Sequence, residues 1–431
     1  MFGGCQGGLN LQSRHLAHIF ATSLYSIGVM NRLIRDNSHI LSPLKPRFYI
    51  SCFANLFLIS QTRKGRKMKK NKLAIVTLGS ILSAGLFMNA FASTVLTPTE
   101  LENIHTPFSY NVGMDFDTME APSANTLPRA KIILSKASTD VKLFRVYRLY
   151  AAGSRGTAID IPTQALADTM KADPKVEAVV GTMNHLPVSA DAWVKQLKNT
   201  FGSQVSQVKA ILIGNEVNGG AYTATQLKAE IQAMATALAN NGLDTIPVSA
   251  SLSGLPRQGN DSIANALFDP YMKAIVSNWS SKWNDGYPFV EFDPYPDALV
   301  PAGSPPQDIM NAAPKVFNEY YADVYRNYIS RFKTTAGKPL QGVIGETGAE
   351  GIKDADWKYG VKVNNALTSA LTTEDKQAKN HTIPTFLFET IDEPGKADGQ
   401  RQMGFFNSDG TGNGSSLPGW VATHKFTGWV S

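Results

Sequence analysis

Cysteine is nearly absent from this chain, and what little there is lies close to the amino terminus. Among 431 residues only Cys5 and Cys52 are cysteines, so residues 93–431 contain none. This excludes a disulfide framework and thiol chemistry for that long remainder. Histidine is also scarce after residue 92, where four remain: His105, His185, His381 and His424. They lack the spacing of metal ligands, so we expect neither a metal site nor a cofactor.

Positive charge is concentrated at the amino terminus. The whole sequence carries a formal net charge of +6. Of its 41 Lys and Arg residues 12 precede Ser93, and of its 35 Asp and Glu residues only Asp36 does. Residues 93–431 therefore hold 29 positive and 34 negative charges, a net charge of −5 with histidine neutral. This balance gives no reason to expect a nucleic acid as partner.

Residues 68–92 have the three parts of a secretory signal peptide. Met68-Lys69-Lys70-Asn71-Lys72 is a basic start, Leu73 to Met88 is an apolar run, and Ala90-Phe91-Ala92 is a small-residue cleavage site. The run is shorter than the roughly 20 residues of a spanning helix, which weighs against the alternative of a membrane anchor. We expect cleavage after Ala92, no membrane anchor after cleavage, and a secreted or periplasmic protein of residues 93–431.

Residues 1–67 have no pattern that predicts a domain. A signal peptide is read at the amino terminus, so one that begins at Met68 suggests that translation starts there. We interpret residues 1–67 as a misassigned upstream extension.

Eight apolar, β-branched runs in residues 93–431 predict strands, with helical patterns between them such as Ala190 to Thr200, Ala224 to Ala239 and Pro314 to Phe332. The runs begin near Ser109, Val141, Val176, Val208, Ile246, Pro288, Leu340 and Ile383. Eight βα units favour an α/β fold with a single (β/α)8 barrel. An open, doubly wound sheet is the alternative, although no Gly-x-Gly-x-x-Gly turn of a dinucleotide fold follows the first strand.

Two short segments carry a glutamate just past a predicted strand. They are Ile213-Gly214-Asn215-Glu216-Val217, after the fourth strand, and Ile344-Gly345-Glu346-Thr347-Gly348, after the seventh. Residues at the carboxyl ends of barrel strands line the active site. Two glutamates that face one crevice are the groups needed to cleave a glycosidic bond. Taken singly, each segment is as well explained by a turn, a helix cap or a solvated glutamate.

The chain resembles glycoside hydrolase family 17, the β-1,3-glucanases and related transglycosylases. Gly214-Asn215-Glu216 matches the Gly-Asn-Glu of the family, and Glu346-Thr347-Gly348 matches its Glu-Thr-Gly. Arg145-Val146-Tyr147 matches its Arg-x-Tyr after strand two. Ile391-Asp392-Glu393-Pro394-Gly395-Lys396 resembles its Phe-Asp-Glu-x-x-Lys, and Gly404-Phe405-Phe406-Asn407-Ser408-Asp409 resembles its Gly-Leu-Phe-x-x-Asp. The matches are collinear from about Tyr110 to Asp409.

The resemblance implies that Glu216 is the general acid/base and Glu346 the nucleophile. Glu346 must be ionised to attack the anomeric carbon, and Glu216 must hold a proton for the leaving oxygen. Two carboxyls roughly 5 to 5.5 Å apart act with retention, whereas a wider gap admits an inverting water. Asn215 is expected to donate a hydrogen bond to the sugar 2-hydroxyl.

Four further residues are predicted to line the site. Tyr147 and Tyr295 are expected to contact sugar, with ordinary packing at a strand end as the alternative. Glu393 and Lys396 match active-site positions of the family and are expected to hold the orientation and charge of Glu216. The alternative for this pair is a surface ion pair that contributes little.

Three departures from the family pattern bear on the substrate. Asp293 stands in Glu291-Phe292-Asp293-Pro294-Tyr295 where the family has a tyrosine, so we expect a phenol to be lost and a negative charge to be gained. Ala349-Glu350 replaces Trp-Pro, which removes a stacking surface. Pro394 replaces an asparagine.

Three functions remain open on this evidence. The first is a retaining endo-hydrolase of β-glucan, most consistent with β-1,3 linkages. The second is a transglycosylase that uses the same two glutamates, and the third is a carbohydrate-binding barrel without turnover. In each case the expected partner is a β-linked glucan polysaccharide or oligosaccharide, and we expect a monomer.

Overall fold

The computed structural model describes residues 95–220, 222–257 and 259–422. The predicted extension (1–67), the predicted signal peptide (68–92) and both cysteines lie outside the described residues. No helix within the described ranges is long and apolar enough to span a bilayer.

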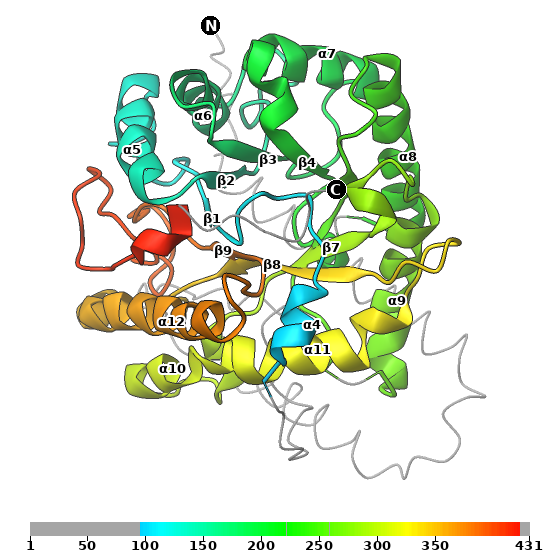
Figure 1. Cartoon of the computed structure of the whole chain (residues 1–431). Coiled ribbons are helices and arrows are strands. Elements are labelled where there is room, and N and C mark those ends of the chain that lie inside the picture. The colour runs from blue at the N-terminus through cyan, green and yellow to red at the C-terminus, as the bar shows by residue number, and fades with distance from the viewer. Residues whose placement is uncertain (1–94, 221, 258, 423–431) are drawn as a thin grey trace, which may run out of the picture. The chain divides into compact units, whose positions relative to one another are not determined.

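Parallel strands close into a barrel with helices around it (Figure 1). The strands are β1 (Val112–Asp115), β2 (Leu143–Val146), β3 (Glu177–Gly181), β4 (Val208–Leu212), β5 (Val248–Ser249), β6 (Ser251–Leu252), β7 (Phe289–Phe292), β8 (Gln341–Thr347) and β9 (Thr385–Leu387). Their order in the sheet is β5-β4-β3-β2-β1-β9-β8-β7-β6. Only Ala250 separates β5, which pairs with β4, from β6, which pairs with β7. These two pieces are one barrel strand, so the described sheet is an eight-stranded barrel.

The (β/α)8 prediction is therefore confirmed, and an open sheet is excluded. Each predicted strand begins within three residues of an observed one, counting β5 and β6 as one. The first and the last of the predicted strands are neighbours in the sheet, because β1 pairs with β9 as well as with β2.

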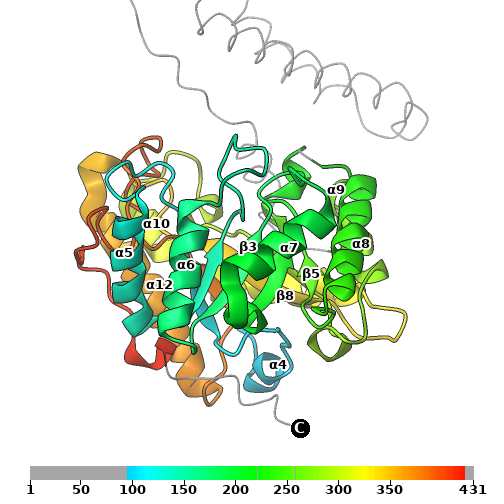
Figure 2. The ribbon, with the colours of Figure 1, turned by 90° about the horizontal axis from the view of Figure 1, so that it is seen from above.

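The helices cover the outside of the strands (Figure 2). They are α4 (Pro98–Glu102), α5 (Leu127–Asp140), α6 (Ile161–Ala172), α7 (Ala190–Phe201), α8 (Ala224–Asn240), α9 (Ser262–Ser277), α10 (Pro306–Ala312), α11 (Ala322–Asn327) and α12 (Trp357–Gln377). Short 3-10 turns are η1 (Gly202–Gln207), η2 (Val217–Gly219), η3 (Asn284–Gly286), η4 (Pro296–Leu299), η6 (Ile329–Arg331), η7 (Asp354–Asp356) and η8 (Gly419–Ala422), and η5 (Val316–Tyr321) is a π-helix.

The single helix predicted from Pro314 to Phe332 is broken into η5, α11 and η6. The π-helical turn rotates the side chains that follow it around the helix axis. Its last two residues, Tyr320 and Tyr321, donate hydrogen bonds to different parts of the chain. Tyr320 Oη donates to the carbonyl of Leu255, and Tyr321 Oη donates to the carbonyl of Gly342. The apolar period alone does not reveal such an insertion.

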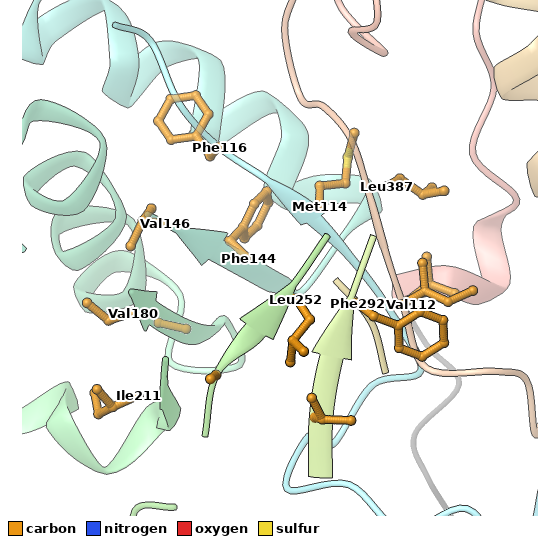
Figure 3. Packing of buried hydrophobic residues seen from close by; sticks show 14 of the residues in the cluster. Val112, Met114, Phe116, Phe144, Val146, Val180, Ile211, Leu252, Phe292 and Leu387 are labelled. Atoms are coloured by element: carbon orange, nitrogen blue, oxygen red, sulfur yellow. The ribbon is translucent and has the colours of Figure 1, made fainter. Parts of the chain in front are cut away.

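Two apolar layers follow from the alternation of side chains along each strand. One set, with Met114, Phe144 and Val180, packs outward against the helices (Figure 3). The other fills the barrel interior with residues such as Phe289 and Phe386, whose rings both meet Phe108 edge to face. The interior is thus a packed core, and polar groups gather at the carboxyl ends of the strands.

Candidate active site

The two glutamates singled out in the sequence both lie at carboxyl ends of strands. Glu216 comes four residues after the end of β4, and Glu346 is the penultimate residue of β8, the seventh barrel strand. The ladder between β8 and β9 shifts register between Ile344 and Thr347, where Gly345 and Glu346 stand opposite the single residue Phe386. A bulge of this kind re-aims side chains, which frees Glu346 from the regular alternation of the strand.

Three donors hold the carboxylate of Glu346. Tyr147 Oη donates to Oε1 at 2.8 Å, and Arg145 Nη1 donates to the same oxygen at 3.1 Å. Tyr295 Oη donates to Oε2 at 2.8 Å. The carboxylate is therefore fixed in one orientation by residues after β2, in β2 and after β7. We call Glu346 and these three donors, together with the neighbouring carboxyl groups of Asp115, Glu291 and Asp293, the carboxylate site.

Arg145 is the only cation that contacts Glu346 in the described chain. Its Nη1 also lies 3.3 Å from Oδ1 of Asp115, and its Nε lies 3.3 Å from Oε2 of Glu291. Burial, with the charge of Glu346 adding to it, raises the pKa of Glu291 to about 7 against the effect of Arg145. Burial likewise raises the pKa of Asp115 well above its usual range. One guanidinium thus faces three carboxyl groups in a dry environment.

Asp293 adds a further carboxyl group to the site, as the sequence predicts. It accepts a hydrogen bond from Ser251 Oγ at 3.1 Å. Burial, and after it the charge of Glu346, raises the pKa of Asp293 well above its usual range. Gly345 permits this crowding, because a Cβ there would lie 2.6 Å from Asp293 Oδ1 and 3.0 Å from Glu291 Cβ.

The phenol of the family pattern is absent at position 293, where Asp293 stands, and Tyr295 still provides a phenol to Glu346. Tyr295, two residues further along, donates the hydrogen bond to Glu346 Oε2. Its backbone is extended, and residues i and i+2 of an extended segment point to the same side. The phenol therefore reaches Glu346 from position 295, beside the new carboxyl group.

Glu216 lies in a tight turn after β4. Its backbone is left-handed, with φ 45° and ψ 47°, a conformation uncommon for residues other than glycine. Gly214, at φ 72°, has no room for a side chain, since a Cβ would lie 2.5 Å from Val217 and 2.8 Å from the ring of Tyr222. Backbone strain of this kind is concentrated at functional sites.

The pKa of Glu216 is raised to about 7. Its side chain retains contact with solvent, yet many protein atoms surround it. Their burial of the carboxyl is the largest cause, the negative charge of Glu346 adds to it, and Arg145 opposes both. Glu346 is thus close enough for its charge to affect the protonation of Glu216.

Asn215 is oriented by Arg145. Arg145 Nη2 donates to Asn215 Oδ1 at 2.7 Å. Because the oxygen of the amide is taken, its Nδ2 group is left to donate elsewhere. Asn215 thus stands between the turn of Glu216 and the guanidinium that contacts Glu346.

Glu393 and Lys396 form an ion pair, and Glu389 joins it. Lys396 Nζ donates to Glu389 Oε1 at 2.7 Å and contacts Glu393 Oε2. Glu389 and Glu393 are 0% and 1% exposed, so the alternative of a surface ion pair is wrong. In the described chain no hydrogen bond or ion pair joins this cluster to Glu216. Lys396 instead lies over the ring of Phe388, 4.3 Å from its centroid.

The sequence reasoning did not identify Arg145, Phe388 or Glu389. Phe388, just after β9, has both Tyr147 and Tyr295 against it in edge-to-face contacts with centroids 6.4 and 6.1 Å away. It thereby connects the Lys396 cluster to the phenols that hold Glu346. Of these three residues, only Arg145 could have been found from the sequence, because it lies in the matched segment Arg145-Val146-Tyr147.

No group of three or more His, Cys, Asp or Glu residues in the described ranges is arranged to hold a metal ion.

No protein-family model and no curated protein matches the chain. Among solved structures it is similar to the glycoside hydrolase family 17 β-1,3-glucanosyltransferase from Rhizomucor miehei, with 17% identity over 72% of this chain and 97% of that one and a TM-score of 0.47. It is similar to a plant β-glucan endohydrolase, with 19% identity over 70% and 98% of the two chains and a TM-score of 0.48. A β-mannanase from Thermomonospora fusca matches with 15% identity over 74% and 89% and a TM-score of 0.38.

Proposed function

We propose that the protein is a retaining glycoside hydrolase that cleaves β-1,3 linkages within β-glucan chains. Glu346 is its nucleophile and Glu216 its general acid/base. The observation that carries this proposal is the difference between the two glutamates. One has its pKa raised to about 7 and faces solvent, while the other is held by a guanidinium and two phenols. A general acid that holds a proton near neutral pH, beside a carboxylate fixed by hydrogen-bond donors, is what the two roles require.

In the first step Glu346 attacks the anomeric carbon of the sugar. A covalent ester forms between that carbon and a Glu346 oxygen, and the bond from the carbon to the leaving oxygen breaks. Glu216 gives its proton to the leaving oxygen, so the departing chain leaves as an alcohol. Tyr147, Tyr295 and Arg145 orient the attacking carboxylate beforehand, which lowers the entropic part of the barrier.

In the second step Glu216, now ionised, takes a proton from water. The resulting hydroxide oxygen bonds to the anomeric carbon as the ester bond to Glu346 breaks, and the stereochemistry is retained. The Nδ2 group of Asn215 is the donor available for the sugar 2-hydroxyl, an interaction that strengthens in the transition state.

The choice of β-1,3-glucan rests on the three motifs that match glycoside hydrolase family 17 and the two that resemble it. A transglycosylase remains the second candidate, since an acceptor sugar hydroxyl replaces water in the second step without any change in the two glutamates. The substitutions at Asp293 and Ala349 favour neither outcome.

The test is a time course of products from linear β-1,3-gluco-oligosaccharides with the wild-type protein and Glu346→Ala. Shorter products alone, made only by the wild type, establish the hydrolase. Products longer than the substrate establish the transglycosylase. Azide distinguishes the two glutamates: an α-glycosyl azide from Glu346→Ala and a β-glycosyl azide from Glu216→Ala support the assigned roles, and the reverse pattern refutes them.

We also propose that residues 68–92 direct export and are removed. Intact-mass analysis of the native protein tests this, because a mass that includes any part of residues 1–92 contradicts it.

A further inference from the structure

A cavity of about 500 Å³ lies apart from the carboxylate site. Its lining comes from η7 and the start of α12, from the segment after β9, and from residues 407–413. These segments are close together on one side of the barrel, where the orange and red parts of the chain meet (Figure 1). None of Glu216, Glu346, Tyr147 or Tyr295 lines it.

The walls of this cavity are held by hydrogen bonds. Arg401 Nη1 donates to Asp354 Oδ2 at 2.7 Å, which ties the segment after β9 to η7. Asp392 Oδ1 accepts from the backbone N–H of Gly404 at 3.0 Å, and Asn413 Nδ2 donates to the carbonyl of Gly404 at 2.7 Å. The cavity is therefore formed before any ligand arrives, which spares the cost of ordering it on binding.

Trp357 provides a flat apolar surface at the cavity. It is the first residue of α12 and is 46% exposed, although large aromatic side chains are ordinarily well buried. Lys358 Nζ lies 5.7 Å from the centre of its ring. The indole N–H has no hydrogen-bond partner among the described residues. An aromatic face with a free polar edge suits a pyranose, whose C–H groups pack on the ring while its hydroxyls bond at the rim.

Uncharged hydrogen-bonding groups line the same cavity as Trp357. The Gln402 amide and the Ser408 hydroxyl line the cavity, and neither has a partner in the described chain. The charge of Arg401 is balanced by Asp354, and burial raises the pKa of Asp392 to about 7. The charges of the lining residues are therefore nearly balanced, and Lys358, near the Trp357 ring, is not among these residues. Apolar surface with a few amide and hydroxyl groups is typical of sites for neutral ligands.

One segment connects the cavity to the carboxylate site. Arg401 Nε, at the cavity, donates to the carbonyl of Lys396 at 2.6 Å. The ammonium of Lys396 lies over Phe388, which contacts the two phenols bound to Glu346. Residues 388–401 thus reach from the cavity to the two phenols that donate to Glu346.

We infer that the cavity beside Trp357 is an accessory saccharide-binding site, which holds a neutral hexose unit of a β-glucan chain outside the carboxylate site. The identity of the polysaccharide rests on the proposed function, while the existence of the site rests on the cavity itself. Such a site increases the local concentration of polymer and leaves short oligosaccharides unaffected.

The first experiment compares kcat/KM of the full chain on polymeric β-1,3-glucan and on a short β-1,3-gluco-oligosaccharide. Trp357→Ala is expected to lower kcat/KM on polymer about five- to tenfold, the size of one lost stacking contact, and to leave the oligosaccharide value within about twofold. Trp357→Phe keeps a ring and should retain most of the activity on polymer. Gln402→Ala should act in the same direction as Trp357→Ala. The matched control is Leu267→Ala, which truncates another exposed apolar residue (57%), in α9.

Equal values for Trp357→Ala and wild type on polymer overturn the inference, and so does a parallel loss on both substrates. The second experiment separates this result from failure of the proposed function. Native gels that contain soluble β-glucan measure binding without turnover, and retardation of the wild type that is lost in Trp357→Ala supports the site even if no substrate is cleaved. Equal retardation of both proteins, or none of either, refutes it.

Discussion

Tyr295 donates a hydrogen bond to Oε2 of Glu346 at 2.8 Å, from a position two residues after Asp293. Tyr147 donates to the other oxygen, also at 2.8 Å. Both oxygens of the carboxylate proposed as nucleophile therefore accept a hydrogen bond from a phenol. Asp293 lies near Glu346, whose charge contributes to the raised pKa of Asp293.

Removal of either phenolic oxygen should slow the proposed reaction. A hydrogen bond to a charged group contributes about 1.5–3 kcal/mol, so we expect Tyr295→Phe and Tyr147→Phe each to lower kcat/KM about 10- to 100-fold. Steady-state kinetics on a β-1,3-gluco-oligosaccharide measures the effect. Tyr287→Phe removes a phenol away from this site and is the matched control. Activity within twofold of wild type in both site variants would show that the phenols only fill space.

The alkaline side of the pH profile should report Glu216. A general acid must be protonated, and the pKa of Glu216 is raised to about 7 by burial and by the charge of Glu346. We therefore expect kcat/KM to be high below pH 7 and to fall tenfold per pH unit well above it. Measurement of kcat/KM from pH 4 to pH 9 tests both the direction of this change and the pH at which it occurs.

Glu350 is the control for that profile, because burial also raises its pKa to about 7. Glu350→Gln should keep the alkaline fall near pH 7 if Glu216 is responsible. Loss of the fall in Glu350→Gln would transfer the assignment to Glu350.

The strands and the positions of the two glutamates could be predicted from the sequence because both signals are local. An apolar run bounded by glycine or polar residues predicts a buried strand, and Glu216 and Glu346 lie within a few residues of the ends of such runs. Two details could not be predicted, because neither changes the apolar pattern. They are the gap at Ala250 between β5 and β6, and the π-helical turn at Val316–Tyr321.

The charge arrangement around Glu346 could not be predicted either. Asp115, Arg145, Glu291 and Glu346 come from four strands, and only the closure of the barrel brings them together. Tyr295 was expected to contact sugar, and its bond to Glu346 depends on the direction of the chain after β7. Such contacts are tertiary, and no spacing in the sequence encodes them.

Gly345 should tolerate no side chain. A Cβ at this position would lie 2.6 Å from Asp293 Oδ1 and 3.0 Å from Glu291 Cβ, both of which are buried. Gly345→Ala is expected to cost about 1–3 kcal/mol of unfolding free energy and to displace Glu346, with a loss of activity. Gly219→Ala is the control, since a Cβ there has no atom within 4 Å. Denaturant unfolding and kcat/KM measure both effects, and an unchanged Gly345→Ala protein would contradict the packing described for this site.

Glu374 should make the fold less stable as the pH rises. It lies buried in α12, accepts a hydrogen bond from the backbone N–H of Ile383, and has a pKa raised by burial from 4.5 to about 8. Below pH 4.5 the carboxyl is protonated in both folded and unfolded chains, so it carries no penalty. Between pH 4.5 and pH 8 the unfolded chain ionises first, and the contribution of Glu374 to stability falls until the folded carboxyl also ionises.

Glu374→Gln keeps the acceptor for Ile383 and removes this titration. We expect the variant to gain stability relative to wild type across that interval, by an amount on the order of a few kcal/mol at pH 8, and to match it near pH 4. Glu102→Gln, at an exposed glutamate in α4, should leave the pH dependence as it is. Denaturant unfolding at pH 4, 6 and 8 measures the difference. A constant offset between wild type and Glu374→Gln at all three pH values would mean that Glu374 does not titrate in this range and that its burial is relieved in solution.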